Sequence, residues 1–364
     1  MLSKACIIGI YQRKLELIAA HGVDLLTLVP PSWRDERGET VLERVYTQGY
    51  DLQTLPIVRN GDFHLHVYRG LGEQMRRFQP DIVHIDEEPY NVATWLAMRQ
   101  SKKAGARTLF FTWQNLNRRY PPPFSWIERQ VLDGVDYAIM GNEAAVGVFR
   151  AKGYRGPHRV IPQFGVDPEM FSPPATRDPG RAFIMGSANR RLVPEKGVDL
   201  LLRAAAGLPG VWRLHIAGDG PALPELRRLA TELGIAARVH FDGPLPSDQV
   251  APYLRNLDAL VLTSRTLPNW KEQFGRVLVE AMACGVPVVG SRSGEIPNVI
   301  GDAGLIVPEE DIDALRTGLI QLMQDDAFRL ELGRRGRQRV MERFTQAQIA
   351  ADTVDVYRRM LARD

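Results

Sequence analysis

Short runs of β-branched and other apolar residues alternate with longer amphipathic segments along most of the chain. An apolar run of about four to eight residues is typical of a buried parallel strand, whereas apolar positions three and four apart indicate a helix. The alternation therefore predicts an α/β protein with parallel sheets and crossover helices. The expected strands are 5–10, 24–29, 81–85, 107–113, 136–141, 158–163, 182–187, 212–218, 238–243, 259–264, 287–291 and 304–308. The expected helices are 91–104, 142–152, 197–207, 221–233, 247–256, 275–284 and 311–323.

A segment rich in proline and polar residues interrupts this pattern at 168–181. Such a composition marks a linker, and a chain of 364 residues exceeds what one hydrophobic core usually serves. We therefore expect an N-terminal domain over 1–175, a second domain over 176–344, and a helix at 345–364 that crosses back to the first. Two such domains would face each other across a cleft with the carboxyl ends of their strands, where open parallel sheets bind ligands.

Composition and charge exclude several classes of protein. Apolar residues make up 45% of the chain, and its net charge of +3 is too small to suggest a nucleic-acid partner. Cys6 and Cys284 are too few for a disulfide framework or a metal cage. With no signal peptide and no apolar run near the roughly 20 residues that span a bilayer, we expect a cytoplasmic protein. The segment RRYPPPFSW at 118–126 leaves peripheral contact with the inner face of a membrane open.

The strongest chemical signal lies in NWKEQFGRVLVEAMACGVPVVGSRSGEIP, residues 269–297. Phe274 and Gly275 open a predicted helix, Glu272 precedes it, and Glu280 lies about two turns inside it. Free backbone N–H groups at a helix start can bind an anion, and carboxylates accept hydrogen bonds from sugar hydroxyls. This segment is therefore a candidate site for a sugar and a phosphate.

Two further motifs lie at strand ends in the second half. In NRRLVPEKGVDLLLRA, Arg191 and Lys196 are cations at a strand-to-helix junction and suit phosphate oxygens. Gly218 in the turn IAGDGP lets a ligand approach the backbone closely. Together these motifs resemble those of the retaining glycosyltransferases of family 4, which have the GT-B architecture of two Rossmann-like domains. The resemblance is dense over about 158–360 and thin over the first half.

The resemblance implies how this chain would work. The second domain would bind a nucleoside-diphosphate sugar, and transfer would retain the sugar's configuration by front-face attack, with the leaving phosphate oxygen helping to deprotonate the acceptor. Fixed cations and helix-start N–H groups would stabilise the leaving diphosphate, so neither a metal nor another cofactor is expected. The implied residues are Arg191 and Lys196 on the diphosphate, Glu272 on the donor sugar, Glu280 on the ribose, and the backbone of Phe274, Gly275 and Arg276 along the sugar and phosphate.

The chain departs from the family's pattern at several positions, among them Arg190, which stands where a Gly usually precedes the phosphate-binding Arg. Gln114 stands where many members carry a His, and it can form hydrogen bonds but cannot exchange protons near neutral pH. Gly9 is the nearest substitute for an early Gly-Gly loop and is assigned to the donor side. Ser247 aligns with an Asp found in some guanine-using members, which favours a UDP-sugar over GDP-mannose.

The acceptor side carries weaker signals. Asp86 and Glu87, in an acidic run with Glu88, follow a predicted strand and could contact acceptor hydroxyls, with a solvated loop as the alternative. Trp113 and Gln114 end another strand and are candidates for contact with the acceptor or with the donor sugar. The acceptor itself could be a glycan, a lipid-linked molecule or a small molecule. Two other functions stay open, namely a GT-B nucleotide-sugar epimerase or hydrolase and a non-catalytic sugar-nucleotide-binding protein.

Overall fold

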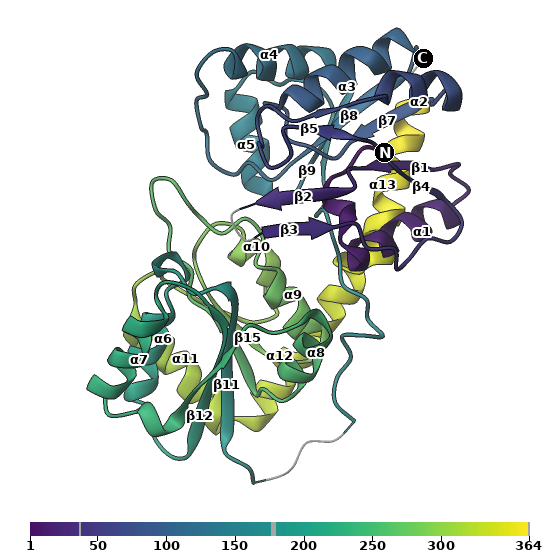
Figure 1. Cartoon of the computed structure of the whole chain (residues 1–364). Coiled ribbons are helices and arrows are strands. Elements are labelled where there is room, and N and C mark those ends of the chain that lie inside the picture. The colour runs from purple at the N-terminus through teal and green to yellow at the C-terminus, as the bar shows by residue number, and fades with distance from the viewer. Residues whose placement is uncertain (36–37, 176–179, 363–364) are drawn as a thin grey trace. The chain divides into compact units, whose positions relative to one another are not determined.

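The computed structural model describes residues 1–35, 38–175 and 180–362, and it divides into two compact units (Figure 1). Unit 1 comprises Met1–Gly165 and Gln346–Asp364, and unit 2 comprises Val166–Thr345. The chain thus passes from unit 1 to unit 2 between Gly165 and Val166, before the predicted linker at 168–181. Residues 176–179 of that linker lie outside the described part. The start of that segment belongs to unit 2 because Phe171 is buried there, where its carbonyl accepts a hydrogen bond from Arg337.

The sheet of unit 1 has the first residues of the chain at its centre. Leu2 pairs in parallel with both Leu28 and Ile85, so Met1–Ser3 join the pair β4–β1 to the strands β7–β8–β9–β10. In this order the chain runs outward in both directions from a central strand, as in doubly wound folds. The strands are β1 (Leu26–Val29), β4 (Asp51–Thr54), β7 (Ile82–Ile85), β8 (Arg107–Thr112), β9 (Tyr137–Met140) and β10 (His158–Val160).

The predicted strand at 5–10 is wrong. These residues form two 3-10 turns, η1 (Ala5–Ile7) and η2 (Gly9–Gln12), because Met1–Ser3 already occupy the sheet and the chain turns away after them. The apolar run is still explained, since Cys6 and Ile7 are buried in the core. Two antiparallel hairpins were not predicted. They are β2 (Ser32–Asp35) with β3 (Gly38–Val41), and β5 (Ile57–Val58) with β6 (Val67–Tyr68).

Helices cover both faces of this sheet. Phe110 of β8 packs in the same core as α2, α3, α4 and α5, while its neighbours Leu109 and Phe111 pack with α1 and α13, as the alternation of side chains along a strand requires. The C-terminal helix α13 therefore belongs to unit 1, where Tyr357 Oη lies 2.7 Å from His84 Nδ1. The helices are α1 (Arg13–Ala20), α2 (Leu71–Phe78), α3 (Val92–Lys103), α4 (Phe124–Gly134), α5 (Glu143–Ala151) and α13 (Gln346–Leu361).

Unit 2 contains a six-stranded parallel sheet in the order β13-β12-β11-β14-β15-β16. The order reverses between β11 and β14, and α6 packs with α7 and α11 while α9 packs with α8 and α12. The strands are β11 (Phe183–Arg191), β12 (Trp212–Asp219), β13 (Val239–Gly243), β14 (Ala259–Leu262), β15 (Val288–Ser291) and β16 (Leu305–Val307). The helices are α6 (Val198–Ala206), α7 (Leu223–Glu232), α8 (Ser247–Arg255), α9 (Arg276–Ala283), α10 (Ile296–Ile300), α11 (Ile312–Gln324) and α12 (Asp326–Arg343), with the short turns η3 (Pro194–Lys196) and η4 (Ala236–Arg238).

Candidate functional site

The loops that follow β11 and β14 diverge where the strand order of unit 2 reverses, and open parallel sheets bind ligands at such a point. Lys196 lies in the first loop and Glu272 in the second. Lys196 Nζ donates a hydrogen bond to Glu272 Oε2 over 2.7 Å, although 76 positions separate the two residues. Ser264 Oγ donates to the same oxygen over 2.8 Å. The structure thus brings two residues predicted for the donor side into direct contact.

Neighbouring segments hold Glu272 in place. Its side chain is largely buried, and its backbone carbonyl accepts a hydrogen bond from Glu295 N over 3.1 Å. Gly294 has a φ of +52°, and a Cβ atom there would lie 2.0 Å from the Glu272 carbonyl, so only glycine allows this close approach. The ring of Trp270 lies 5.0 Å from Lys196 Nζ. The pair is therefore rigidly framed by the turns that follow β14 and β15.

The start of α9 lies next along the chain from Glu272. Gly275 takes the left-handed conformation, with φ of +77°, and the helix begins at Arg276. Arg276 Nε donates to Glu280 Oε1 over 2.7 Å. Burial raises the pKa of Glu280, and the neighbouring guanidinium opposes that shift. Phe274 is buried, with its ring edge-on to that of Phe344, so its side chain serves packing. The groups of this first turn that suit an anion are backbone N–H groups.

The other residues predicted for the donor in unit 2 have different surroundings. Gly218 has a φ of +126°, and a Cβ there would lie 1.8 Å from the carbonyl of Asn189, so packing between β11 and β12 by itself requires glycine. Arg191 is exposed at the end of β11, opposite Asp219. Ser247 is exposed at the first residue of α8. The contacts described above therefore centre on Lys196, Glu272 and α9.

Sequence reasoning missed Ser264 and Trp270. Both carried a signal, because Ser264 is the polar residue that ends the predicted strand 259–264, and Trp270 stands two positions before Glu272. Neither residue type identifies a partner by itself. Their contacts with Glu272 and Lys196 appear only once β11 and β14 lie side by side.

In unit 1 the strand order reverses between Met1–Ser3 and β7, and the acids that follow β7 lie at this point. Asp86 and Glu87 are buried in contacts within unit 1, and their role at the acceptor stays a prediction. Asp86 accepts hydrogen bonds from Ser3 Oγ over 2.5 Å and from Gln163 Nε2 over 2.9 Å. Glu87 forms an ion pair with Lys4. Although burial opposes ionisation, this ammonium helps to lower the pKa of Glu87 to about 2.

Gly9, assigned from sequence to the donor side, is also covered by its own unit. Its N–H donates to Glu43 Oε2 over 2.6 Å, and a Cβ atom at Gly9 would lie 2.2 Å from Val45 Cγ2. The segment 43–45 thus closes over this turn. Steric fit against that segment is enough to explain the glycine, and the donor-side assignment of Gly9 stays a prediction.

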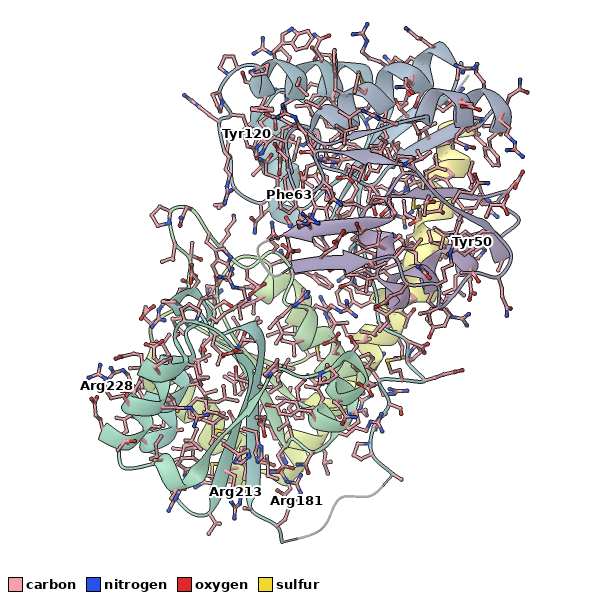
Figure 2. All side chains as sticks on the ribbon, in the orientation of Figure 1. Tyr50, Phe63, Tyr120, Arg181, Arg213 and Arg228 are labelled. Atoms are coloured by element: carbon pink, nitrogen blue, oxygen red, sulfur yellow. The ribbon has the colours of Figure 1, made fainter. Side chains whose placement is uncertain are left out.

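Glu88 is the member of the acidic run that stays partly exposed. Its carboxylate accepts hydrogen bonds from Thr112 Oγ1 over 2.6 Å and from Trp113 N over 2.8 Å. Burial raises the pKa of Glu88 to about 7 against the effect of these two bonds. The adjacent Gln114 is buried and donates from Nε2 to Tyr120 Oη over 2.7 Å; Tyr120 is labelled in Figure 2. Glu88, Trp113 and Gln114 therefore form one cluster at the carboxyl ends of β7 and β8.

Other features of the described residues lie outside these clusters. No group of three or more metal-ligating side chains is placed to hold an ion among residues 1–35, 38–175 and 180–362. In the same ranges, no helix has the length and apolarity needed to cross a bilayer. A cavity of about 560 Å³ in unit 1 lies between the starts of β1 and β7 and is lined by Leu26, Ile82 and His84. It contains none of the predicted site residues.

Two Rossmann-like units with parallel sheets define the GT-B class of folds, and comparison with solved structures agrees. A glycosyltransferase from Rickettsia africae superimposes with a TM-score of 0.75 at 16% identity, over 100% of this chain and 98% of that one. The Anabaena protein HepE in complex with UDP gives a TM-score of 0.72 at 18% identity, over 95% and 96% of the two chains. The predicted GT-B architecture is therefore confirmed.

Sequence comparisons add the family. The model "Glycosyl transferase 4-like domain" matches residues 13–163, and "Glycosyl transferases group 1" matches 179–339. A GDP-mannose-dependent alpha-(1-6)-phosphatidylinositol monomannoside mannosyltransferase from Mycolicibacterium smegmatis is 33% identical over 54% of this chain and 58% of its own length. A D-inositol 3-phosphate glycosyltransferase from the same organism is 37% identical over 53% and 46%. This chain spans about half the length of these curated relatives. Each unit thus matches a glycosyltransferase domain model, and together the two matches support a family 4-like glycosyltransferase.

Proposed function

We propose that this chain transfers a sugar from a nucleoside-diphosphate sugar to an acceptor hydroxyl, with retention and without a metal. The observation that carries the proposal is the contact between Lys196 and Glu272 at the switch point of unit 2, next to the start of α9. The relatives support the donor class, because one is named as GDP-mannose-dependent and HepE was solved with UDP.

In this proposal the cationic groups bind the diphosphate. Lys196 supplies a charge that its pair with Glu272 already orients, and the N–H groups of the first turn of α9 supply fixed dipoles. Arg191 reaches the phosphate from the end of β11. Glu272 accepts hydrogen bonds from the donor sugar, and Glu280 accepts them from the ribose, since vicinal hydroxyls are donors that suit a carboxylate.

These groups would act mainly in the transition state. Breaking the bond between the sugar's anomeric carbon and the phosphate oxygen builds negative charge on the diphosphate and positive charge on the sugar. Lys196 and the α9 amides stabilise the leaving group without reorganising. The leaving oxygen accepts the proton of the acceptor hydroxyl, whose oxygen attacks from the same face, and configuration is retained. Fixed charges of this kind make a divalent cation unnecessary.

The remaining assignments concern the acceptor and the base. We assign Glu88, Trp113 and Gln114 to the acceptor, because they cluster at the strand ends of unit 1 while Asp86 and Glu87 are used internally. In the resemblance to family 4, the exposed Ser247 aligns with an Asp found in some guanine-using members, and its lack of a carboxylate favours UDP-sugars over GDP-mannose.

Calorimetric titration with UDP and GDP in the presence of EDTA tests the donor site. Tight binding of UDP and weak binding of GDP is the expected result. Preference for GDP would overturn the assignment of the base, and binding of neither nucleotide, with or without Mg²⁺, would overturn the transferase itself. Product analysis with a UDP-sugar then separates the alternatives, because an epimerase or hydrolase consumes the donor without an acceptor and a binding protein does not consume it at all.

A further inference from the structure

The outer face of α2, α3 and α4 in unit 1 is strongly basic. These helices lie side by side in Figure 1, and α3 contacts both of its neighbours. Together with residues 116–123 before α4, they expose eight cations but two acids. The cations are Arg76, Arg77, Arg99, Lys102, Lys103, Arg118, Arg119 and Arg129, and the acids are Glu73 and Asp133. The net charge of +3 for the whole chain conceals this concentration. We call this surface the basic face.

The cations on α2 and α3 are not neutralised by ion pairs, as charges elsewhere are. On α7 of unit 2, Arg228 pairs with Glu225 over 2.5 Å and with Glu232 over 3.0 Å. In contrast, the ion pairs found among the described residues reach none of the cations on α2 and α3. Several of these cations lie in the last turn of a helix, where they also complement the helix dipole, but that effect does not account for Arg99. Nitrogen-tipped side chains project from the outer side of these helices in Figure 2.

Aromatic and proline side chains border the basic face at the start of α4. Trp126 is 51% exposed, and its ring lies 5.4 Å from that of the half-buried Trp95. The Arg99 guanidinium lies 4.9 Å from the Trp95 ring. The three prolines at 121–123 immediately precede the helix and are exposed. An exposed Trp is favourable where an apolar layer meets a polar one, as at the surface of a bilayer.

We propose that the basic face docks on the surface of an anionic lipid bilayer, with its cations against the headgroups and Trp126 at the interface. The array of cations complements anionic headgroups. An apolar layer beneath the charges also accommodates Trp126 and the prolines, and a nucleic-acid backbone has no such layer. The chain leads from Gln114, at the carboxyl end of β8, through residues 116–123 into α4, so the docked edge borders the acceptor candidates of unit 1.

Binding to vesicles without any substrate tests this proposal separately from the proposed transferase. Vesicles of pure phosphatidylcholine are compared with vesicles that also contain phosphatidylglycerol, by co-sedimentation of the full chain. We expect binding only to the anionic vesicles, and weaker binding as salt rises. Each cation near an anionic surface contributes about fivefold to partitioning. The variant R99E/K102E/K103E should therefore bind anionic vesicles at least about 100-fold more weakly. Trp126→Ser should weaken this binding by a smaller factor, and that factor should stay the same as salt rises.

The control variant R203E/R213E/R227E makes the same change in net charge with exposed cations of unit 2 and should bind vesicles like the parent. Both triple variants should keep the thermal midpoint and the UDP affinity of the parent, which excludes misfolding as the cause. Equal losses in the two triple variants, or equal binding to neutral vesicles, would overturn the proposal. Displacement from anionic vesicles by a single-stranded oligonucleotide at lower concentration than the lipid would assign the face to nucleic acid instead.

Discussion

Lys196→Ala is the substitution that tests the phosphate site most directly. A hydrogen bond to a charged group contributes about 1.5–3 kcal/mol, which corresponds to roughly 10- to 150-fold in affinity. In the free protein Lys196 already pairs with Glu272 at 2.7 Å and its side chain is 21% exposed, so binding a phosphate exchanges one partner for another. We therefore expect the lower part of that range, a loss of about 10- to 30-fold for UDP.

Uridine provides the internal comparison because it lacks the diphosphate. Calorimetry of UDP and uridine on the parent and on Lys196→Ala should show the loss for UDP and a change below about twofold for uridine. Arg203→Ala, which removes an exposed cation from the last turn of the neighbouring α6, should change neither affinity. Equal losses for UDP and uridine would remove Lys196 from the phosphate site. An equal loss of UDP affinity in the control would show that the effect is only one of net charge.

Three other substitutions test the remaining assignments. Glu280→Ala should weaken UDP and uridine alike, by about tenfold or more in calorimetry, because both contain the ribose; parent-like affinity for both would refute the ribose contact. Glu272→Ala should leave UDP affinity within about threefold and lower turnover of a UDP-sugar by about 100-fold, whereas a large loss of UDP affinity would place Glu272 on the nucleotide. Glu88→Gln should flatten the pH dependence of stability. Since the folded-state pKa of Glu88 is raised from 4.5 to about 7, the folded protein binds more protons between these values, and the parent loses stability as pH rises through this window. Thermal midpoints at pH 5 and pH 8 measure this slope, and equal slopes for parent and variant would contradict the shift.

Sequence patterns predicted the buried parallel strands because each is a short apolar run that the sheet buries on both faces. The expected strands at 107–113 and 259–264 correspond to Arg107–Thr112 and Ala259–Leu262 in the structure. The strand predicted at 5–10 was wrong because burial alone does not distinguish a strand from a 3-10 turn. Met1–Ser3, and not residues 5–10, lie between β1 and β7 in the sheet. The hairpin β2–β3 was missed because its strands, SWRD and GETV, contain mainly polar residues, with GETV fully exposed, and only pairing with each other defines them.

The residues proposed for the donor site could be chosen from the sequence because they stand in contiguous motifs at strand ends. The order of strands places Lys196 and Glu272 at one edge, but which atoms meet depends on details such as the approach of Gly294 to the Glu272 backbone. The partners of Asp86 and Glu87 were not predictable in this way. Ser3 and Lys4 lie more than 80 positions away and reach these acids only because the start of the chain inserts between β1 and β7.

The same strand order therefore has different chemical consequences in the two units. In unit 2 the switch point brings together a cation, a carboxylate and a helix start, all groups that suit a sugar diphosphate. In unit 1 the chain's own Ser3 and Lys4 satisfy the first two acids after the central strands, so an acceptor would have to compete with buried internal bonds to reach them. In the proposed function, recognition of the acceptor then falls to positions one step further out. Glu88 is the acid at this position, and Thr112 and Trp113 each donate a hydrogen bond to one of its carboxylate oxygens. Its pKa is raised to about 7. For this reason we expect the ionisation of Glu88 to contribute to how acceptor use changes between pH 6 and 8.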